Sequence, residues 1–393
     1  MVGKKKASFR PKPKVNDYAT IKKKQRERAQ AASALSKGHE TQDELDNKQV
    51  LSEDDRKQQQ RVLDIFRHAF SETLTSSTLT TTLQLVKQAL YDRDFGKAFG
   101  DPEHLEVYAA RWSPTRALCY ASVLERISEH LELLSDGGDE AAMAPTTDLQ
   151  KPQHLKILSI GGGAAELVAL GAFLNENPSS LSGSIALVDS GPWKTIVTKL
   201  TTALTTPPPL SKYASEAVKL SNAAMVQPPR LTTTFDQQDA LTFNKDSFPS
   251  LLGTAPLLVT ILFTLNELFA TSGIGKPTTF LLNLTATIPL GSLLLVVDSP
   301  GSYSETTVGK EAKRYPMHWL LDEILLRTKP ESLNGRRWAK IESHESVWFR
   351  LASEGLDYPI TLENMRYQMH LYRAEDAYQQ QEDDDDQASG LSV

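Results

Sequence analysis

The pattern of apolar positions along this 393-residue chain changes character twice. Residues 1–50 hold few large apolar side chains, so they cannot offset the entropy lost on ordering and are predicted to be disordered. Across residues 51–134 apolar side chains such as Val62 and Phe66 recur at helical spacing. From residue 154 onward, short apolar runs alternate with helical segments, a pattern typical of a parallel sheet covered by helices.

The chain is therefore predicted to divide into five regions. They are a disordered basic tail (1–50), a helical extension (51–134), a linker loop (135–153), an α/β domain (154–376) and an acidic disordered tail (377–393). The linker is rich in Gly, Asp, Ala, Pro and Thr and has no periodicity.

Three segments of the extension are predicted to be helices. The first begins at Ser52, where three acidic residues follow a capping residue. The others span residues 82–91 and 114–134. Ser113 is predicted to cap the last helix, with Pro114 in its first turn, where a missing N–H costs nothing.

Five short apolar runs predict the strands of a doubly wound, mostly parallel sheet. The runs are 156–160, 184–189, 231–235, 257–263 and 292–297. A helical piece is inserted at residues 213–225. Two later β-rich runs, 347–351 and 365–372, have no long helix between them and should pair antiparallel at one edge.

The two most apolar stretches, residues 251–270 and 278–297, are not interpreted as membrane spans. Residues such as Pro256 and Asn283 break them into strand-sized and helix-sized pieces. Buried parallel strands with their covering helices have this pattern. We therefore expect a soluble protein, and the lysine-rich first residues do not match a secretory leader.

Three consecutive glycines, Gly161, Gly162 and Gly163, lie between the first predicted strand and the helix that follows. Glycine takes positive φ readily and lets the backbone approach a ligand closely. The free N–H groups at the start of the helix point at the same place. The turn is thus where an α/β sheet would hold a nucleotide-like cofactor.

Acidic residues accompany this turn. Asp189 ends the second strand, where a carboxylate can accept both hydroxyls of an adenosine ribose, or can cap the next helix. Asp239 follows the third strand and is placed to meet the adenine amine, with Asp236 as its competitor. Glu166, in the first helical turn, would repel a pyrophosphate. It therefore favours the cationic S-adenosylmethionine over a dinucleotide, unless it serves only the helix dipole.

Asn266 and Glu267 follow the fourth strand, at the edge where such a sheet opens on its ligand. Asn266 could present its amide to the reacting base. Glu267 could orient the substrate or simply begin the next helix. Both are therefore candidate catalytic residues.

Charge is distributed unevenly along the chain. Residues 1–30 hold eleven basic and two acidic side chains, a net charge of +9, whereas the whole chain carries −6 and the other 363 residues therefore carry −15. Such a tail is typical of a nuclear-import signal or an RNA-binding arm, although it can also be a solvated tail without a partner. The acidic remainder argues against an RNA substrate unless the tail or local patches contact the phosphates.

Residues that bind metals or form disulfides are scarce. The single cysteine, Cys119, excludes an intramolecular disulfide and favours a reducing compartment. The eight histidines show no His-x-x-His or His-Glu-x-x-His spacing, so we expect no metal site.

Three sequence blocks carry a family resemblance. They are Gly161-Gly-Gly-Ala-Ala-Glu-Leu-Val-Ala-Leu, Arg111-Trp-Ser-Pro-Thr-Arg116-Ala-Leu-Cys-Tyr-Ala and Leu262-Phe-Thr-Leu-Asn-Glu-Leu-Phe. Together they resemble the fungal family of S-adenosylmethionine-dependent methyltransferases that includes the large-subunit (25S) ribosomal RNA uridine-N3 methyltransferase. The resemblance covers roughly residues 60–375.

This resemblance implies an α/β, class I (Rossmann-like) methyltransferase fold. Its seven-stranded, mostly parallel sheet would have an antiparallel edge strand, preceded here by an N-terminal helical extension. Residues 154–376 would form the S-adenosylmethionine-dependent methyltransferase domain. Ser159 stands where many class I enzymes have an acid, which leaves more of the donor orientation to Glu166 and Asp189.

The resemblance also implies methylation at N3 of a uridine in ribosomal RNA, either naked or within a pre-ribosomal particle. N3 carries a proton and lies on the Watson–Crick edge, so the reaction needs a base and a uridine splayed out of its pairing. Candidate RNA contacts are Arg111, Trp112, Arg116, Arg336 and Arg337. Arg111 and Arg116 could instead meet the donor carboxylate or pair with core acids.

A monomer in the nucleus or nucleolus is expected, with the cytoplasm as the alternative location. Two other classes of function stay open. A class I methyltransferase acting on a small molecule or a protein would share every donor motif. A non-catalytic ribosome-assembly factor would bind RNA without the donor, and a nicotinamide dehydrogenase is a more remote case.

Overall fold

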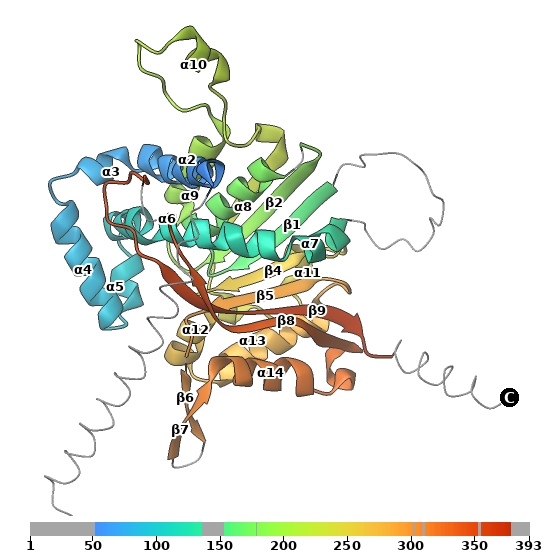
Figure 1. Cartoon of the computed structure of the whole chain (residues 1–393). Helices are drawn as coiled ribbons and strands as arrows, with labels where there is room; N and C mark the ends of the chain where they lie inside the picture. Colours follow the sequence, from blue (N-terminus) through green and yellow to red (C-terminus); the bar gives the residue numbers. More distant parts are fainter. Residues whose placement is uncertain are drawn as a thin grey trace, which may run out of the picture. The chain divides into compact units, whose positions relative to one another are not determined.

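The computed structural model describes most of the chain (Figure 1). The described residues are 52–135, 153–177, 179–301, 303–308, 311–352 and 355–378. The basic tail predicted at 1–50 lies outside them, as do nearly all of the predicted linker and of the predicted acidic tail. The division into five regions therefore stays a prediction.

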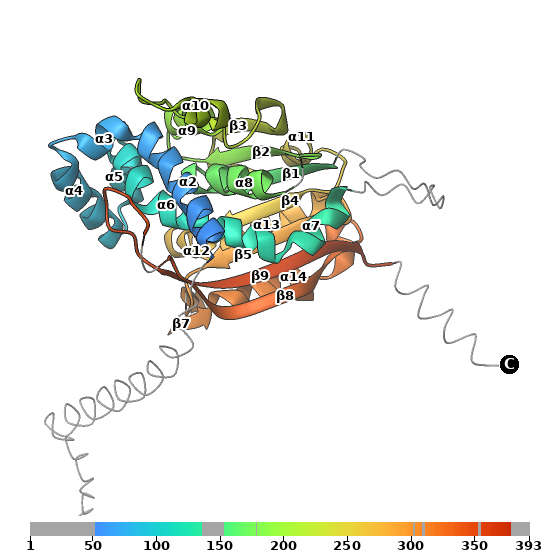
Figure 2. The same cartoon turned by 45° about the horizontal axis from the view of Figure 1, so that its top comes forward.

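A seven-stranded sheet forms the centre of the described fold. Its strands are β1 (Gln153–Ile160), β2 (Leu181–Asp189), β3 (Leu231–Gln237), β4 (Leu258–Leu262), β5 (Leu293–Asp298), β8 (Arg336–Phe349) and β9 (Met365–Asp376). The order across the sheet is β3-β2-β1-β4-β5-β9-β8 (Figure 2). Strand β9 pairs antiparallel with both β5 and β8. The predicted doubly wound sheet, with an antiparallel pair at one edge, is confirmed.

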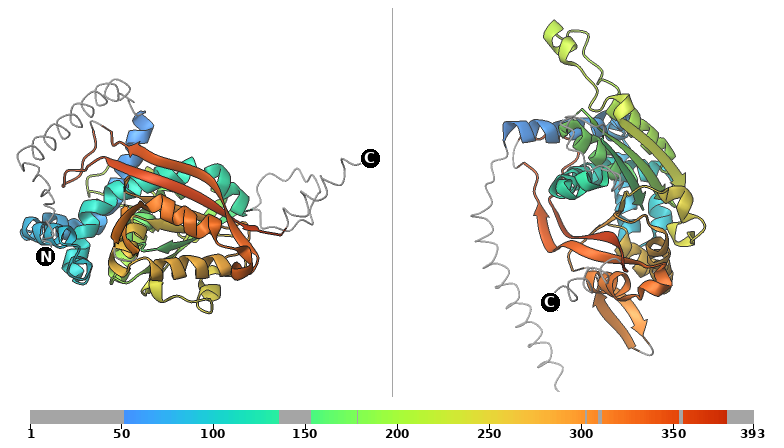
Figure 3. Two further views of the ribbon diagram at one scale, coloured as in Figure 1. Left: turned by 90° about the horizontal axis from the view of Figure 1, so that it is seen from below. Right: turned by 90° about the vertical axis from the view of Figure 1, so that its right-hand side faces the viewer.

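Helices cover both faces of this sheet (Figure 3). One face carries α2 (Glu53–Ala69), α6 (Pro102–Arg126), α7 (Ser128–Ser135), α8 (Ala164–Glu176) and α9 (Lys194–Thr205). The other carries α11 (Phe248–Leu252), α13 (Gly275–Thr287) and α14 (Met317–Arg327). Successive strand residues serve opposite layers, so Ile157 packs with the first cluster and Leu158 with the second.

The remaining elements lie around these layers. They are α3 (Ser71–Thr75), α4 (Leu79–Tyr91), α5 (Phe95–Phe99), α10 (Glu216–Ser221), α12 (Leu265–Ser272), the hairpin of β6 (Tyr303–Val308) and β7 (Glu311–Pro316), and 3₁₀ turns at Pro228–Arg230, Ala240–Thr242 and Pro330–Leu333. The helix predicted at 213–225 is thus only α10, within a long connection. None of the described helices is long and apolar enough to cross a membrane.

The predicted start of a helix at Ser113 and Pro114 is wrong. Helix α6 begins twelve residues earlier than predicted, at Pro102, and Asp101 caps it by accepting hydrogen bonds from the N–H groups of Glu103 and His104. The same cap-and-proline signal therefore occurs twice in the sequence, and the earlier one is used. Pro114 lies inside the helix and is buried.

A distant tyrosine compensates for this internal proline. Proline has no N–H, so the carbonyl four residues earlier, that of Ala110, loses its helical partner. The Tyr358 hydroxyl, in the connection between β8 and β9, donates a hydrogen bond to that carbonyl at 2.7 Å. The same connection is tied to α2, where the Gln60 side chain accepts from the Asp357 N–H at 2.8 Å. The β8–β9 connection thus stabilises α6 at its weakest point.

We predict that Tyr358→Phe lowers the free energy of unfolding by about 1–3 kcal/mol, because it leaves a buried carbonyl without a partner. The loss should be smaller in a Pro114→Ala background, since the restored N–H can take the same carbonyl. Denaturant unfolding of the four proteins of this cycle measures the coupling. Equal losses in both backgrounds would show that the tyrosine does not replace the missing N–H.

Candidate functional site

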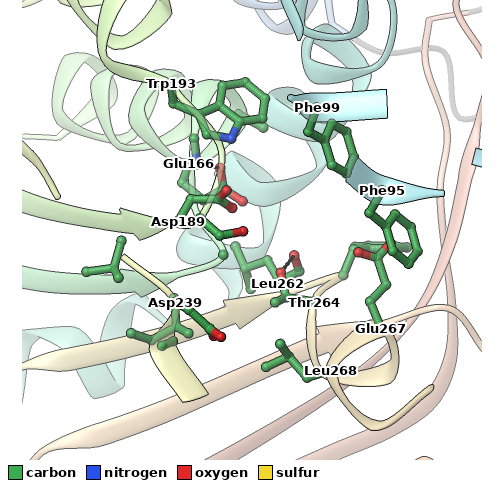
Figure 4. A pocket seen from close by; sticks show the side chains of 18 of the residues that line it. Phe95, Phe99, Glu166, Asp189, Trp193, Asp239, Leu262, Thr264, Glu267 and Leu268 are labelled. Atoms are coloured by element: carbon green, nitrogen blue, oxygen red, sulfur yellow. Dashed lines mark hydrogen bonds between the residues drawn. The ribbon is translucent and has the colours of Figure 1, made fainter. Parts of the chain in front are cut away.

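A cavity of about 350 Å³ opens at the carboxyl ends of β1, β2 and β4 (Figure 4). The strand order reverses at this point of the sheet, because β1 lies between β2 on one side and β4 on the other. Helices α5 and α6 of the predicted extension contribute to its wall, together with α12. The extension and the sheet therefore build the cavity jointly.

The glycine turn forms one wall of the cavity. Gly161 has φ of +68°, and a Cβ there would lie 2.3 Å from the Thr264 hydroxyl oxygen. A Cβ at Gly163 would lie 2.8 Å from the Trp193 ring. Gly161 and Gly163 line the cavity, whereas Gly162 packs against Ser159 behind it. The missing side chains let Thr264, which precedes α12, and the Trp193 ring close tightly around the turn.

Glu166 locks this turn. Its Oε2 accepts a hydrogen bond from the Gly163 N–H at 2.8 Å, as in a capping box at the start of α8. Burial raises the pKa of Glu166, and the Gly163 N–H and the Arg116 charge act in the opposite direction. The residue lines the cavity, so its carboxylate is placed both to hold the helix start and to face a cation.

Asp189 is the last residue of β2, Asp239 follows the neighbouring strand β3 by two residues, and both line the cavity (Figure 4). Asp189 accepts a hydrogen bond from the Gly191 N–H at 2.6 Å, and burial raises its pKa to about 6. Asp239 caps the 3₁₀ turn at Ala240–Thr242. Its competitor Asp236 does not line the cavity. The structure therefore brings the first two carboxylates together beside the glycine turn.

Arg116 supplies the positive charge of the cavity wall. Its guanidinium donates a hydrogen bond to the Tyr108 hydroxyl and lies 5.3 Å from the centre of the Phe263 ring. Phe263 itself has φ of +54° at the end of β4. Such a conformation is strained for a bulky residue and concentrates at functional sites.

Glu267, on α12, lines the same cavity as Arg116. Burial raises the pKa of Glu267 to about 7, Arg116 lowers it and Asp298 raises it. The neighbouring candidate, Asn266, donates its backbone N–H to Asp298 at 3.0 Å, and it does not line the cavity. Of the two predicted catalytic residues, the structure brings only Glu267 to the cavity.

Two phenylalanines at the mouth were missed from the sequence. Phe95 and Phe99 of α5 line the cavity with nearly parallel rings, whose centroids are 6.1 Å apart. Both are half-buried, and Figure 4 shows Phe95 beside Glu267. Their only local signal is the spacing of four residues behind the capping Asp94.

The predicted RNA contacts separate into different places. Arg116 lines the cavity, whereas Arg111 forms an ion pair with Glu363 at 2.6 Å and Trp112 stacks on Tyr108 behind the wall. Arg336 donates to the Ile288 carbonyl at 2.7 Å.

Arg337 pairs with Glu375 at 2.9 Å. It and Arg336 lie at the start of β8, which runs parallel to β5, so they are at the end of the sheet opposite the cavity. Among the described residues there is no group of three or more His, Cys, Asp or Glu side chains that could hold a metal ion.

We predict that Gly161→Ala lowers the free energy of unfolding more than Gly273→Ala does. Both positions have positive φ, so both substitutions carry a backbone strain of about 1–3 kcal/mol. Only at position 161 does the new Cβ collide, since nothing lies within 4 Å of one at position 273. Denaturant unfolding of the two variants compares them directly. Equal losses would mean that Thr264 moves aside freely.

Comparison with known proteins agrees with this geometry. A family model described as S-adenosylmethionine-dependent methyltransferase matches residues 66–373. The chain is 31% identical over 343 residues to the 25S rRNA (uridine(2843)-N(3))-methyltransferase of Saccharomyces cerevisiae, a match that covers 80% of this chain and 85% of the relative.

Solved structures of methyltransferases are more distant. An O-methyltransferase family protein from Burkholderia thailandensis has 13% identity and a TM-score of 0.32, covering 77% of this chain and 74% of that chain. The CurJ carbon methyltransferase has 14% identity and a TM-score of 0.36, covering 79% and 70%. These similarities carry no further argument. On the family match and the yeast relative, the chain belongs to the family of S-adenosylmethionine-dependent methyltransferases.

Proposed function

We propose that this protein methylates N3 of a uridine in large-subunit ribosomal RNA. The observation that carries the proposal is the identity with the yeast uridine-N3 methyltransferase, which extends over four fifths of this chain. The cavity supports it with an acid beside an aromatic wall, next to a site suited to the methyl donor.

The residues of the cavity fit S-adenosylmethionine. Four carboxylates line it, those of Glu166, Asp189, Asp239 and Glu267, against the one guanidinium of Arg116 among its lining residues. A surplus of acids suits a donor that carries an ammonium and a sulfonium and has no phosphate. When bound, the donor supplies an electrophilic methyl group on sulfur.

Individual residues have distinct roles toward that donor. We assign Gly161 and Gly163 to the close backbone approach, Asp189 to the ribose hydroxyls and Asp239 to the adenine amine. Glu166 holds the turn and faces the cationic end. Arg116, which the sequence placed among the RNA contacts, is positioned to meet the donor carboxylate, the other role considered for it. Gly162 supports the turn from behind.

Glu267 is the proposed base. N3 of uridine must lose its proton to become a nucleophile, and the Glu267 carboxylate would accept that proton. The bound donor would supply the methyl group, its C–S bond breaking as the N3–C bond forms, and would leave as a neutral thioether. A carboxylate with an ordinary pKa would be a weak base for this step. Burial raises the pKa of Glu267 to about 7, which brings it close to the operating pH. Asn266, whose backbone is held by Asp298, positions the start of α12.

The half-buried rings of Phe95 and Phe99 offer a surface for the uracil. A base that reacts on its Watson–Crick edge has to leave its helix and is usually held by stacking on aromatic side chains. Because α5 belongs to the helical extension, the extension is part of the substrate site in this proposal.

Naked ribosomal RNA or a pre-ribosomal particle is the proposed partner, and the nucleus or nucleolus the proposed location, with the cytoplasm as the alternative. The protein acts as a monomer in this proposal. The basic tail of residues 1–30, with its net charge of +9, would strengthen binding to RNA.

The proposal is tested by mass spectrometry of ribosomal RNA nucleosides. We expect cells that lack the protein to lose one N3-methyluridine, and the purified protein with S-adenosylmethionine to restore it on their RNA. An unchanged nucleoside profile would refute the substrate. Methylation of a protein or a small molecule, without any dependence on RNA, would support the alternative substrate class.

We predict that Glu267→Gln slows methyl transfer by about 10²–10⁴-fold, as expected when a general base is lost. The base is the carboxylate form and its pKa is raised to about 7. The rate of the natural protein should therefore fall as the pH drops through 7, and the variant should lose this dependence.

Single-turnover rates from pH 5.5 to 8.5 measure both effects. Glu331→Gln, at an exposed position of the Pro330–Leu333 turn, is the control for removing an acid and should keep the natural profile. A variant of Glu267 that retains the fall near pH 7 would assign the base to another group.

A further inference from the structure

An aromatic and two cations gather near the end of β8. The Arg350 guanidinium carbon lies 4.9 Å from the centre of the Trp348 ring, and that of Arg366 lies 5.5 Å from it. Trp348 is 47% exposed, although it is one of the most costly side chains to leave in water. We call these three residues the Trp348 cluster. Neither the family similarity nor the cavity assigns it a role.

The cations of the Trp348 cluster have no acidic ion-pair partner among the residues that the structure describes. Neither Arg350 nor Arg366 forms an ion pair with a described carboxylate, whereas Arg111, Arg337 and Lys340 each pair with an acid. Arg366 is held in place instead, because its Nε donates to the Ser346 hydroxyl at 2.8 Å. Two like charges held against one ring in an acidic protein gain most when an anion lies beside them.

The cluster lies at the same end of the sheet as the cavity, the end where the parallel strands finish. Trp348 is opposite Arg366 in the β8–β9 ladder, and Gln368 of β9 is opposite Asp298, the last residue of β5. The Trp348 cluster therefore extends past the end of β5. By the usual spacing of strands it is roughly 14 Å across the sheet from β4, which ends at the cavity (Figure 1).

We propose that the Trp348 cluster binds the single-stranded RNA that flanks the target uridine. Its guanidinium groups contact backbone phosphates, and the indole holds them in place and offers apolar area to a neighbouring base. This inference rests on the proposed RNA substrate and adds to it a place where the strand is anchored outside the cavity.

RNA suits the cluster for a physical reason. The acids that line the cavity repel a phosphate backbone, so the strand needs cations beyond the cavity mouth. A uridine that enters the cavity is splayed out, and the nucleotides next to it are therefore unpaired. Arginine together with an exposed aromatic ring is the combination that binds unpaired nucleotides.

The test uses the full chain and a fluorescein-labelled oligouridylate of about 12 nucleotides. Arg350→Gln combined with Arg366→Gln should weaken binding at least about tenfold at low salt. It should also reduce the slope of log affinity against log salt by about 1.4, that is, about 0.7 for each lost phosphate contact. Fluorescence anisotropy over a salt series gives both numbers.

The control is Arg327→Gln combined with Lys329→Gln. It also removes two positive charges, at exposed positions at the end of α14 and just after it. These positions are near the start of β8, and therefore at the opposite end of the sheet from the cluster. The control should leave the slope unchanged. Trp348→Leu should weaken binding, Trp348→Phe should restore most of it, and calorimetric binding of S-adenosylmethionine should be the same in all variants.

Two results would overturn the inference. One is a loss of affinity in the arginine variant that is no greater than in the control. The other is binding of poly-glutamate as tight as that of oligouridylate at equal salt, which would indicate a general anion surface. RNA that binds through the cluster but gains no N3-methyluridine would contradict the proposed function alone.

Discussion

One guanidinium in the cavity wall, that of Arg116, holds together the two halves of the site. It comes from α6 in the helical extension and reaches the end of β4, where it lies against the Phe263 ring. Burial drives the carboxyls of Glu166 and Glu267 toward their neutral forms, and the positive charge of Arg116 opposes this for both. Without that charge the carboxyls of Glu166 and Glu267 would stay protonated to higher pH, and a protonated carboxyl neither attracts a cation nor accepts a proton.

The helical extension is therefore a part of the site. Its helix α5 provides Phe95 and Phe99 at the mouth, and α6 provides Arg116 and Tyr108. Helix α6 can serve in this way only if it is continuous through Pro114, and the Tyr358 hydroxyl takes the carbonyl that the proline leaves without a partner. A residue of the β8–β9 connection thus stabilises the helix that carries the charge of the cavity.

These dependencies explain how much could be predicted from the sequence. The sheet and the glycine turn followed from local signals, since each buried strand is a short apolar run and Gly161 needs its positive φ whatever surrounds it. The start of α6 was mispredicted because the compensation for Pro114 comes from a tyrosine 248 residues beyond Ala110.

Contacts between residues far apart in the sequence also determine which partners the arginines have. Arg336 and Arg337 were predicted to contact RNA. In the structure Arg336 donates to a backbone carbonyl and Arg337 forms an ion pair with Glu375, and both lie at the start of β8, at the end of the sheet opposite the cavity. The Trp348 cluster had no sequence signal, because Arg366 reaches Trp348 only through the register of the β8–β9 pair.

The distribution of charge between the cavity and the Trp348 cluster answers the objection that an acidic chain should avoid RNA. A cationic donor and a polyanionic substrate have opposite electrostatic needs, and one surface cannot meet both. The carboxylates lie inside the cavity, where low polarity strengthens their attraction for a sulfonium. Arg350 and Arg366, which form no ion pair with a described carboxylate, lie outside it. Arg366 is on β9, two strands from β4 in the sheet order, and Arg350 follows β8, which is three strands from β4. The net charge of −6 is therefore a poor guide to RNA binding. The RNA strand meets the guanidinium groups of the Trp348 cluster, and only the splayed base, which carries no phosphate, enters the acidic cavity.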